Sequence, residues 1–339
     1  MKDDFLPELT KGTIIMSRVR LARNVNSLPF CIEDENSAKE VVKKVYRALS
    51  PVDTFNLYYV NNLTDTQLES MKESHLISQN LIDNKKTGAA LINGDKSISI
   101  MINEEDVIRE QCFMRGLKLE EAYQKLQKTD DAITRNIDIA FDEEYGYLTN
   151  CISNMGTGLR ASVMMFLPAL SQSGQIASLM EEMKEIGLTV RGVYGEGSKA
   201  EGYIYQISNE ITLGVSEEEI IETVESAVIR ICDAEQDYSR RIFSKHEIEV
   251  LDRAKKSYGI LTNAVLLSYS EFLDNVANIK VGAILGLFDL SDIDGLDDLI
   301  VKVRAANLCE HFGKNLSAFD RDLYRAELVG EILTKLKEN

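Results

Sequence analysis

Arginine and glutamate side chains recur in the N-terminal two-thirds of the chain, where loops and strand ends are expected. They are Arg18 and Arg20, Glu104 and Glu105 with Arg109, Arg160, and Arg191 with Glu196. Several arginines that meet in one cleft could neutralise a triphosphate and stabilise the charge that develops during its transfer. Glutamates among them would not bind phosphate, but paired carboxylates can hold a guanidinium group by bidentate hydrogen bonds. These residue types therefore indicate phosphoryl transfer between ATP and a guanidinium group.

Each of these segments also has a purely structural interpretation. Arg18 and Arg20 could be surface residues of an edge strand, and Glu104-Glu105-Asp106 could be an acidic turn or the cap of a helix. The chain contains neither the phosphate-binding loop GxxxxGKS or GxxxxGKT nor the dinucleotide fingerprint GxGxxG. The residues by themselves therefore predict a phosphate-handling enzyme and leave its reaction open.

A glycine turn precedes Arg160. Gly156-Thr157-Gly158 stands directly before an apolar run that is compatible with a helix. Glycine lets the backbone approach a ligand closely, and a helix N-terminus offers free N–H groups with a partial positive charge. We therefore expect an anion-binding site at this turn, with Arg160 adding a fork of donors. The alternative is a tight turn without a ligand.

Composition limits the class of protein. The chain has 339 residues, 44% hydrophobic and 27% charged, as in a globular protein of one or two domains. It has no apolar run of ~18 residues and no apolar signal core at its start, so we expect a cytoplasmic protein without a membrane segment. Five widely spaced cysteines without a CxxC pair fit reduced thiols. The net charge of −17 argues against nucleic acid as a partner, because phosphates would be repelled.

The elements that must position these residues follow from the hydrophobic pattern. Residues 13–20 read as a strand with Arg18 and Arg20 on one face, and residues 88–103 as a hairpin. A capping box at Ser216–Glu219 opens a long helix. Near residue 244 the strand signals stop and only helical spacing continues. We therefore predict an α+β domain over 1–243, with a central antiparallel sheet flanked by helices, and an all-helical domain over 244–339.

Five blocks of sequence stand in a recognisable order along the chain. They are SRVRLARN (17–24), NEED followed by Arg109 (103–109), CISNMGTGLRASV (151–163), RGVYGEGS (191–198) and YQISNEITLG (205–214). These blocks resemble the phosphagen kinase superfamily, in a form closest to its bacterial protein-arginine kinase branch, over nearly the whole chain. The resemblance implies a phosphagen kinase-like catalytic domain that transfers the γ-phosphoryl group of MgATP to a guanidinium nitrogen. It also implies that Mg²⁺ is held mainly by the nucleotide phosphates and water.

The resemblance assigns roles to individual residues. The phosphate-binding arginines would be Arg18, Arg20, Arg109, Arg160 and Arg191, and His75 would lie near the adenine. Glu105 would align the guanidinium group and accept its proton, with Glu196 of a mobile loop as its partner. Cys151 stands at the reactive-cysteine position beside the guanidinium group.

In the protein-arginine kinase branch, the C-terminal helical domain mediates dimerisation and binds phosphoarginine. Arg321-Asp322 match that binding motif, although a salt bridge at a helix N-terminus would explain the pair as well. The partners that the resemblance implies are a second copy of the chain, proteins with exposed arginines, a zinc-finger activator protein and chaperone–protease machinery. The implied role is to mark proteins for regulated proteolysis or to control a stress response.

The chain departs from the pattern of the resembled family at four positions. Val107 and Phe166 replace usual histidines, Ile152 replaces a proline, and Tyr324 replaces an arginine. These changes affect the expected nucleotide contacts and phosphoarginine affinity more than the reaction, because the expected arginines and glutamates are all present.

Two other functions remain open. A small-molecule kinase that phosphorylates free arginine would be expected to have a helical domain ahead of SRVR, and here SRVR begins at Ser17. A non-catalytic phosphoarginine-binding adaptor would not need Glu105, Glu196 and the five arginines.

Overall fold

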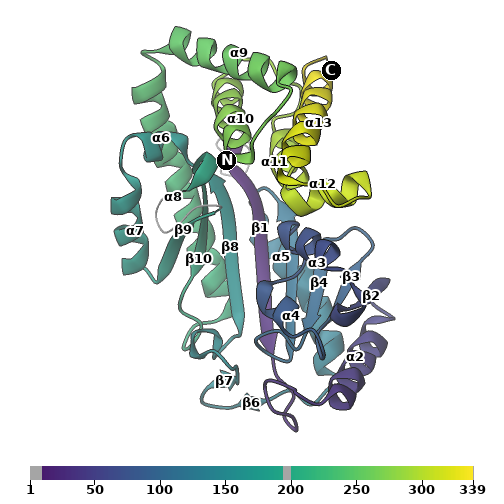
Figure 1. The fold of residues 1–339 in the computed structure, drawn as a ribbon. Coiled ribbons are helices and arrows are strands. Elements are labelled where there is room, and N and C mark those ends of the chain that lie inside the picture. The colour runs from purple at the N-terminus through teal and green to yellow at the C-terminus, as the bar shows by residue number, and fades with distance from the viewer. Residues whose placement is uncertain (1–9, 194–199, 339) are drawn as a thin grey trace.

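An eight-stranded antiparallel sheet forms the centre of the protein (Figure 1). The computed structural model describes residues 10–193 and 200–338. In spatial order the strands are β2 (Phe55–Tyr59), β3 (Ala89–Asn93), β4 (Ile98–Ile102), β5 (Ile108–Arg115), β1 (Ile14–Arg23), β8 (Leu159–Phe166), β10 (Ile204–Asn209) and β9 (Leu188–Gly192). The strands β6 (Phe141–Asp142) and β7 (Gly146–Tyr147) form a separate small hairpin. The predicted α+β fold with an antiparallel sheet is confirmed.

Helices cover the two faces of this sheet unequally. One face packs against α2 (Glu35–Leu49), α5 (Leu119–Thr134), α7 (Ile176–Glu185) and α8 (Glu217–Phe243). On the other face, α3 (Asp65–Glu73) and α4 (Gln79–Asp83) cover the end formed by β2, β3 and β4. The short helix α6 (Pro168–Gln172) packs against α8. The middle of the second face, formed by β5, β1 and β8, is therefore left for the predicted site residues.

The last part of the chain is helical, as predicted. Its helices are α9 (Glu247–Asn263), α10 (Tyr269–Ile284), α11 (Asp294–Lys302), α12 (Ala305–Phe312) and α13 (Ala318–Glu338). Figure 1 shows them gathered at one end of the sheet, near the start of β1. They share a hydrophobic core with that end, because Phe166 and Ile204 belong to the same buried cluster as Phe272 and Leu273. Among the described residues, none of the helices has the length and hydrophobicity that a membrane span requires.

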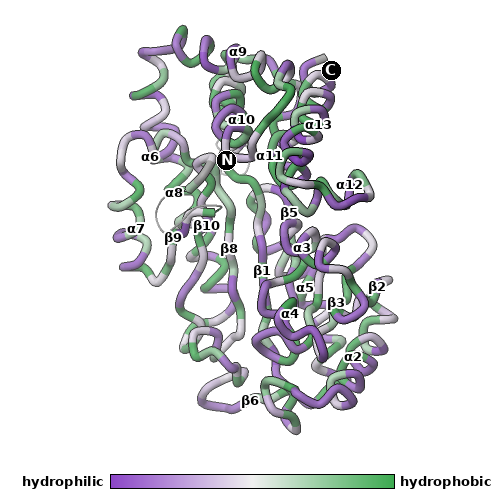
Figure 2. Tube along the Cα trace, in the orientation of Figure 1, coloured by the Kyte–Doolittle hydropathy of each residue, from purple (hydrophilic) through white to green (hydrophobic). Residues whose placement is uncertain are grey.

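Local sequence explains several of these elements. Ile98 N–H donates to Asn93 Oδ1 at the predicted hairpin between β3 and β4. Both hydrogen bonds of the predicted capping box between Ser216 and Glu219 form at the start of α8. In β1, apolar residues at the start give way to polar residues further along (Figure 2). The described residues also include short 3₁₀ helices at Val60–Asn62, Ile152–Asn154 and Glu201–Tyr203.

The expected helix after the glycine turn is wrong. Residues Leu159–Phe166 form strand β8, which pairs on one side with β1 and on the other with β10. A short apolar run does not distinguish a buried strand from a buried helix, and pairing with two neighbours decides the outcome. The anion-binding site at a helix N-terminus therefore does not exist here, and Arg160 is presented by a strand.

Candidate active site

The strand register places the predicted arginines on one face of the sheet. Arg20 lies directly opposite Arg160, and Arg109 lies opposite Ala22. Directly opposite residues in an antiparallel ladder project to the same face, as do residues two apart on one strand. The same rule places Arg18 and, through β10, Arg191 on this face. The opposite face carries buried apolar residues such as Val19 and Leu21.

These arginines repel one another and are incompletely hydrogen bonded. Burial lowers the pKa of Arg18 to about 10, with further lowering by Arg109 and Arg160. Burial also lowers the pKa of Arg20 well below its ordinary value, again with help from neighbouring arginines. In the described part of the chain, the Nε atoms of Arg20 and Arg160 are buried without a hydrogen-bond partner. A bound polyanion would relieve both the repulsion and the unmet donors.

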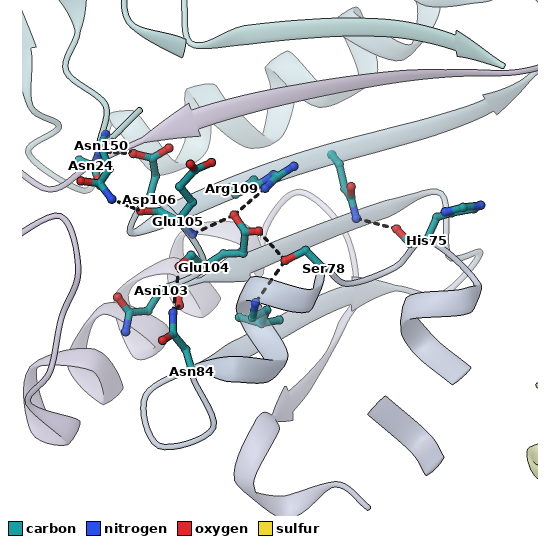
Figure 3. Close-up of polar contacts among 12 residues, drawn as sticks. Asn24, His75, Ser78, Asn84, Asn103, Glu104, Glu105, Asp106, Arg109 and Asn150 are labelled. Atoms are coloured by element: carbon teal, nitrogen blue, oxygen red, sulfur yellow. Dashed lines mark hydrogen bonds and ion pairs between the residues drawn. The ribbon is translucent and has the colours of Figure 1, made fainter. Parts of the chain in front are cut away.

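The two adjacent glutamates after β4 have different environments. Glu104 is 4% exposed and accepts hydrogen bonds from Arg109 Nη1 at 2.6 Å, from Ser78 and from its neighbour's backbone N–H (Figure 3). Burial opposes the ionisation of Glu104, but Arg109 and Ser78 together bring its pKa below the ordinary value. Glu104 is therefore an ionised residue that holds Arg109 in place.

The Glu105 carboxylate is half-buried and accepts no hydrogen bond from the described residues. Burial raises its pKa, and the adjacent charges of Glu104 and Asp106 raise it further. Such a carboxylate is available to a ligand and has a greater affinity for a proton than an ordinary glutamate. This is the environment expected of a residue that grips a guanidinium group and accepts its proton.

Asp106 connects this turn to the segment that carries Cys151. Its Oδ1 accepts from Asn24 Nδ2 at 2.7 Å and from the backbone N–H of Asn150 at 2.7 Å (Figure 3). Asn150 Nδ2 also donates to the backbone oxygen of Glu105 at 3.2 Å. No role was predicted for Asn24, Asp106 or Asn150, although Asn24 and Asp106 stand inside the blocks SRVRLARN and NEED. Their network fixes Cys151 relative to Glu105.

A cavity of about 190 Å³ brings most of the predicted catalytic and phosphate-binding residues together. It is lined by Arg20, Glu105, Arg109, Cys151 and Arg160, with Gly158 at its wall. Cys151 Sγ lies 3.0 Å from Ser153 Oγ. The cavity thus combines three cationic side chains with one carboxylate and one thiol.

The glycine turn contributes to this cavity differently from the expectation. A side chain at Gly156 would collide with the backbone of Thr212, so its conformation serves a close contact within the chain. A side chain at Gly158 would meet the backbone oxygen of Ala22 and the guanidinium group of Arg23 at 2.6 Å. The two glycines let the turn pack tightly against its neighbours, and only Gly158 reaches the cavity.

Arg23 supports the site, and no role was predicted for it from the sequence. It is buried, forms an ion pair with Asp130 at 2.9 Å and donates to the backbone oxygen of Thr157 at 3.0 Å. Its guanidinium group lies 3.6 Å from the ring centre of Tyr147. Arg23 therefore supports the glycine turn from the side opposite the cavity.

His75 lies apart from the small cavity, in a larger one of about 680 Å³ that is also lined by Met16, Phe113 and Met164. Its backbone has φ of 60°, and Gln111 Nε2 donates to its carbonyl oxygen at 3.0 Å. Burial lowers the pKa of His75 to about 4, with smaller effects of Arg18 and Arg304, so the ring is neutral. Its Nε2 is buried without a hydrogen-bond partner among the described residues.

Four predicted residues within the described part of the chain line neither cavity, namely Arg18, Arg191, Arg321 and Asp322. Arg321 and Asp322 lie on α13, and Asp322 Oδ1 accepts from Arg325 Nη1 at 2.6 Å. Asp322 therefore forms a salt bridge with Arg325 of the same helix, and not with Arg321. Arg191 is exposed on β9 and close enough to lower the pKa of Arg160, after the effect of burial. The predicted residue Glu196 lies outside the described residues.

The four departures from the family pattern have different surroundings. Val107 is fully buried, and Ile152 is 81% exposed. The ring of Phe166 is buried with Lys280 Nζ at 4.8 Å from its centre, so an ammonium group contacts the aromatic face. Tyr324 packs on the ring of Phe312.

Two protein families match this chain. The family described as ATP:guanido phosphotransferase, C-terminal catalytic domain, matches residues 37–238. The family described as Protein-arginine kinase McsB C-terminal domain matches residues 247–339.

Individual proteins are similar as well. The protein-arginine kinase of Caldanaerobacter subterraneus subsp. tengcongensis is 42% identical over 331 residues, which are 96% of this chain and 98% of that protein. The protein-arginine kinase of Clostridium kluyveri is 42% identical over 329 residues, 95% of each chain. Among solved structures, the duplicated taurocyamine kinase from Schistosoma mansoni with bound transition state analog components has a TM-score of 0.60 at 26% identity, over 66% of this chain and 33% of that chain. A lombricine kinase has a TM-score of 0.57 at 26% identity, over 66% of each chain.

Proposed function

This chain belongs to the ATP:guanido phosphotransferase family, and within it to the protein-arginine kinases, and we propose that the small cavity around Arg20 and Glu105 is its active site. The enzyme phosphorylates arginine. The observation that carries the proposed location is that a hydrogen-bond-free carboxylate, Glu105, shares one cavity with Arg20, Arg109 and Arg160. A site that binds only phosphate would need the arginines and no carboxylate. A site that binds a phosphate and a guanidinium group together needs the arginines and the carboxylate.

The proposed division of labour follows from charge. Arg20, Arg109 and Arg160 would hold the phosphoryl group during its transfer, and the unmet Nε donors of Arg20 and Arg160 would bind its oxygens. Glu105 would hold the acceptor guanidinium group by charge-assisted hydrogen bonds. A bond forms between a guanidinium nitrogen and the γ-phosphorus while the bond from that phosphorus to the bridging oxygen breaks. ADP leaves, and the proton of the attacking nitrogen passes to Glu105.

A guanidinium group has a pKa above ~12, so it is a poor nucleophile until one nitrogen is oriented and deprotonated. The raised pKa of Glu105 suits the acceptance of that proton. Cys151, on the wall of the same cavity, would contact the guanidinium group. Glu196 would supply a second carboxylate, a role carried over from the family resemblance alone.

We propose ATP as the phosphoryl donor, with its base in the larger cavity beside His75. Mg²⁺ is expected to enter with the nucleotide, because it binds phosphate oxygens and retains several waters. When bound, it would neutralise charge on the β- and γ-phosphates. Within residues 10–193 and 200–338, no group of three or more His, Cys, Asp or Glu side chains is placed to hold a metal ion.

The alternative function differs from the proposed one in the acceptor, which would be free arginine instead of an arginine in a protein. A small-molecule kinase would phosphorylate free arginine faster than an arginine in a protein. The test is a competition in which the enzyme, MgATP, free arginine and an arginine-rich protein are incubated together. We expect label on the protein, and faster labelling of free arginine would favour the small-molecule function.

Further properties are proposed from the resemblance. We propose that residues 1–243 and 244–339 are two domains, which is supported by the end of α8 at Phe243 and by the separate family matches. Dimerisation, phosphoarginine binding at Arg321 and Asp322, a zinc-finger activator, chaperone–protease partners and a role in proteolysis or stress control remain predictions. A cytoplasmic location is also proposed, and all five cysteines, each within the described residues, are unpaired.

A further inference from the structure

The larger cavity has walls from two parts of the chain that are far apart in sequence. Met16, Phe113 and Met164 line it from the central strands of the sheet. Asn307 and His311 line it from α12, in the C-terminal helical part. A ligand in this cavity would therefore touch both the part that carries the arginines and the C-terminal helices.

The position of this cavity suits the base of a nucleotide whose phosphates lie at the arginines. Met16 is four residues from Arg20 on β1, about 14 Å along an extended strand, and Arg18 lies between them. Figure 2 shows the same strand becoming apolar towards its start. The charges that line the larger cavity offset one another, because Asp95, Asp298 and Glu310 stand beside Lys96, Arg115 and Lys302. Three arginines against one carboxylate line the small cavity, so phosphates are attracted there instead. The electrostatics thus orient a nucleotide with its phosphates at Arg20 and its base near Met16.

One carboxylate joins α12 to α3, which also lines this cavity through Ser70. Glu73 ends α3, and its Oε2 accepts from the backbone N–H groups of Ala306 at 3.0 Å and Asn307 at 2.9 Å. These are first-turn N–H groups of α12, which have no partner within their own helix. Arg304 Nε lies 3.9 Å from Glu73 Oε1. The side chain of Glu73 is only 10% exposed, so these hydrogen bonds are shielded from water.

The same end of α3 also presents His75. Ser70 Oγ and Ser74 Oγ donate to Asn307 Oδ1 at 2.6 and 3.3 Å, so a second set of hydrogen bonds ties α3 to α12. His75 follows directly, and its ring points away from the Glu104 cluster in Figure 3. A shift of α12 would therefore move the segment that places His75 in the larger cavity.

We propose that the nucleotide pocket is composite, with α12 forming one wall, and that Glu73 is the positioning residue that holds α12 and His75 together around the base. This inference rests on the proposed function, because it assigns the larger cavity to the nucleotide of that reaction. It gives the C-terminal helices a direct part in nucleotide binding.

The first test compares Glu73→Gln with the matched control Glu69→Gln. Glu69 lies on the same helix and pairs with Lys72 at the surface. Glutamine at position 73 keeps the shape of the side chain and loses the charge that strengthens both hydrogen bonds to α12. We expect MgADP to bind Glu73→Gln about tenfold more weakly, with KM for ATP rising in parallel and kcat within about twofold of wild type. The control should bind MgADP as wild type does.

The second test uses the unmodified chain, so it does not depend on the folding of a variant. Hydrogen exchange measured with and without MgADP should show protection both in residues 70–75 and in residues 305–312. Wild-type MgADP affinity in Glu73→Gln, a loss of kcat without a change in affinity, or protection that excludes residues 305–312 would each overturn the inference. Because these readouts follow MgADP, a chain that shows them and fails to phosphorylate arginine would overturn the proposed acceptor and leave the composite pocket standing.

Discussion

Arg20 and Arg160 lie directly opposite each other on β1 and β8, with both side chains on the same face of the sheet. Like charges at directly opposite positions destabilise a sheet, by about 0.2–1 kcal/mol for an exposed pair. Here both Nε atoms are also buried without a partner in the described part of the chain. The pair therefore destabilises the unliganded fold locally. A polyanion bound between the two guanidinium groups would remove this destabilisation.

Replacing Arg160 by methionine should separate stability from activity. The variant loses a repelled charge and an unmet donor, so the midpoint of thermal unfolding without nucleotide should rise by roughly 2 °C. Its kcat/KM should fall at least about 100-fold, because one donor to the transferred phosphoryl group is gone. Differential scanning calorimetry and steady-state kinetics measure the two effects.

A matched control is Arg135→Met, since Arg135 is an exposed arginine at the C-cap of α5 that forms an ion pair with Asp131. This control should retain wild-type activity without becoming more stable. A lower unfolding midpoint for Arg160→Met than for wild type would contradict the interpretation of the Arg20–Arg160 pair.

Glu105→Gln should lose catalysis while keeping nucleotide affinity. Glutamine can still donate and accept hydrogen bonds, but it cannot take a proton from the guanidinium group. We expect kcat to fall at least about 100-fold, with the dissociation constant for MgADP changed by no more than about twofold. Stopped assays and MgADP titration would measure these values, and a tenfold loss of MgADP affinity would place Glu105 in the nucleotide site instead.

The pH dependence of the wild-type reaction should reflect the ionisation of Glu105. Burial and the adjacent carboxylates raise the pKa of Glu105, and the ionised form is the one that acts as base. Activity should therefore be lost on acidification at a higher pH than an ordinary glutamate would give. A profile of kcat/KM against pH that is flat down to the ordinary range of a glutamate would show that Glu105 is not the base.

Glu235 should make the stability of the fold depend on pH near neutrality. Its buried carboxylate accepts from the backbone N–H groups of Ala169 and Leu170, and burial raises its pKa from 4.5 to about 7. The protonated form is therefore favoured by folding, so this contribution is fully present below 4.5 and is lost as pH rises through about 7. Over that range the free energy of unfolding should fall by an amount on the order of 2 kcal/mol.

Glu235→Gln should lack this slope in urea unfolding measured from pH 5 to 8. Glu185→Gln, which changes an exposed carboxylate of α7, should retain it. Equal slopes in wild type and Glu235→Gln would show that another group causes the pH dependence.

The sequence indicated which residues lie in the candidate site, but it did not indicate which residues hold them in place. The period of two placed Arg18 and Arg20 on one face of β1, and the register confirms it. The same period puts Arg23 on the opposite face, where it pairs with Asp130 behind the glycine turn. The odd spacing from Arg20 therefore indicated that Arg23 does not face the site. Its ion-pair partner Asp130 could not be predicted, because Asp130 is 107 residues away and only the fold brings the two together.

The wrong prediction around Arg160 has a related cause. The apolar run after Gly158 satisfies a helix and a buried strand equally well, and only its pairing with β1 and β10 makes it a strand. The meeting of Arg20 with Arg160 depends on that pairing, so local pattern could not give it. The distinction between Glu104 and Glu105 was likewise assigned by resemblance, and the structure supplies the physical difference, because Arg109 and Ser78 engage Glu104.

In the proposed reaction, Glu105 and the facing arginines promote transfer of the γ-phosphoryl group of ATP to arginine side chains of proteins. The most direct measurement is to incubate the full chain with MgATP and an arginine-rich protein, and to detect acid-labile phosphate on arginine by mass spectrometry. We expect labelled arginines with the wild-type chain and at least about 100-fold less label with Glu105→Ala. Absence of label with the wild-type chain, or equal label with Glu105→Ala, would contradict the account.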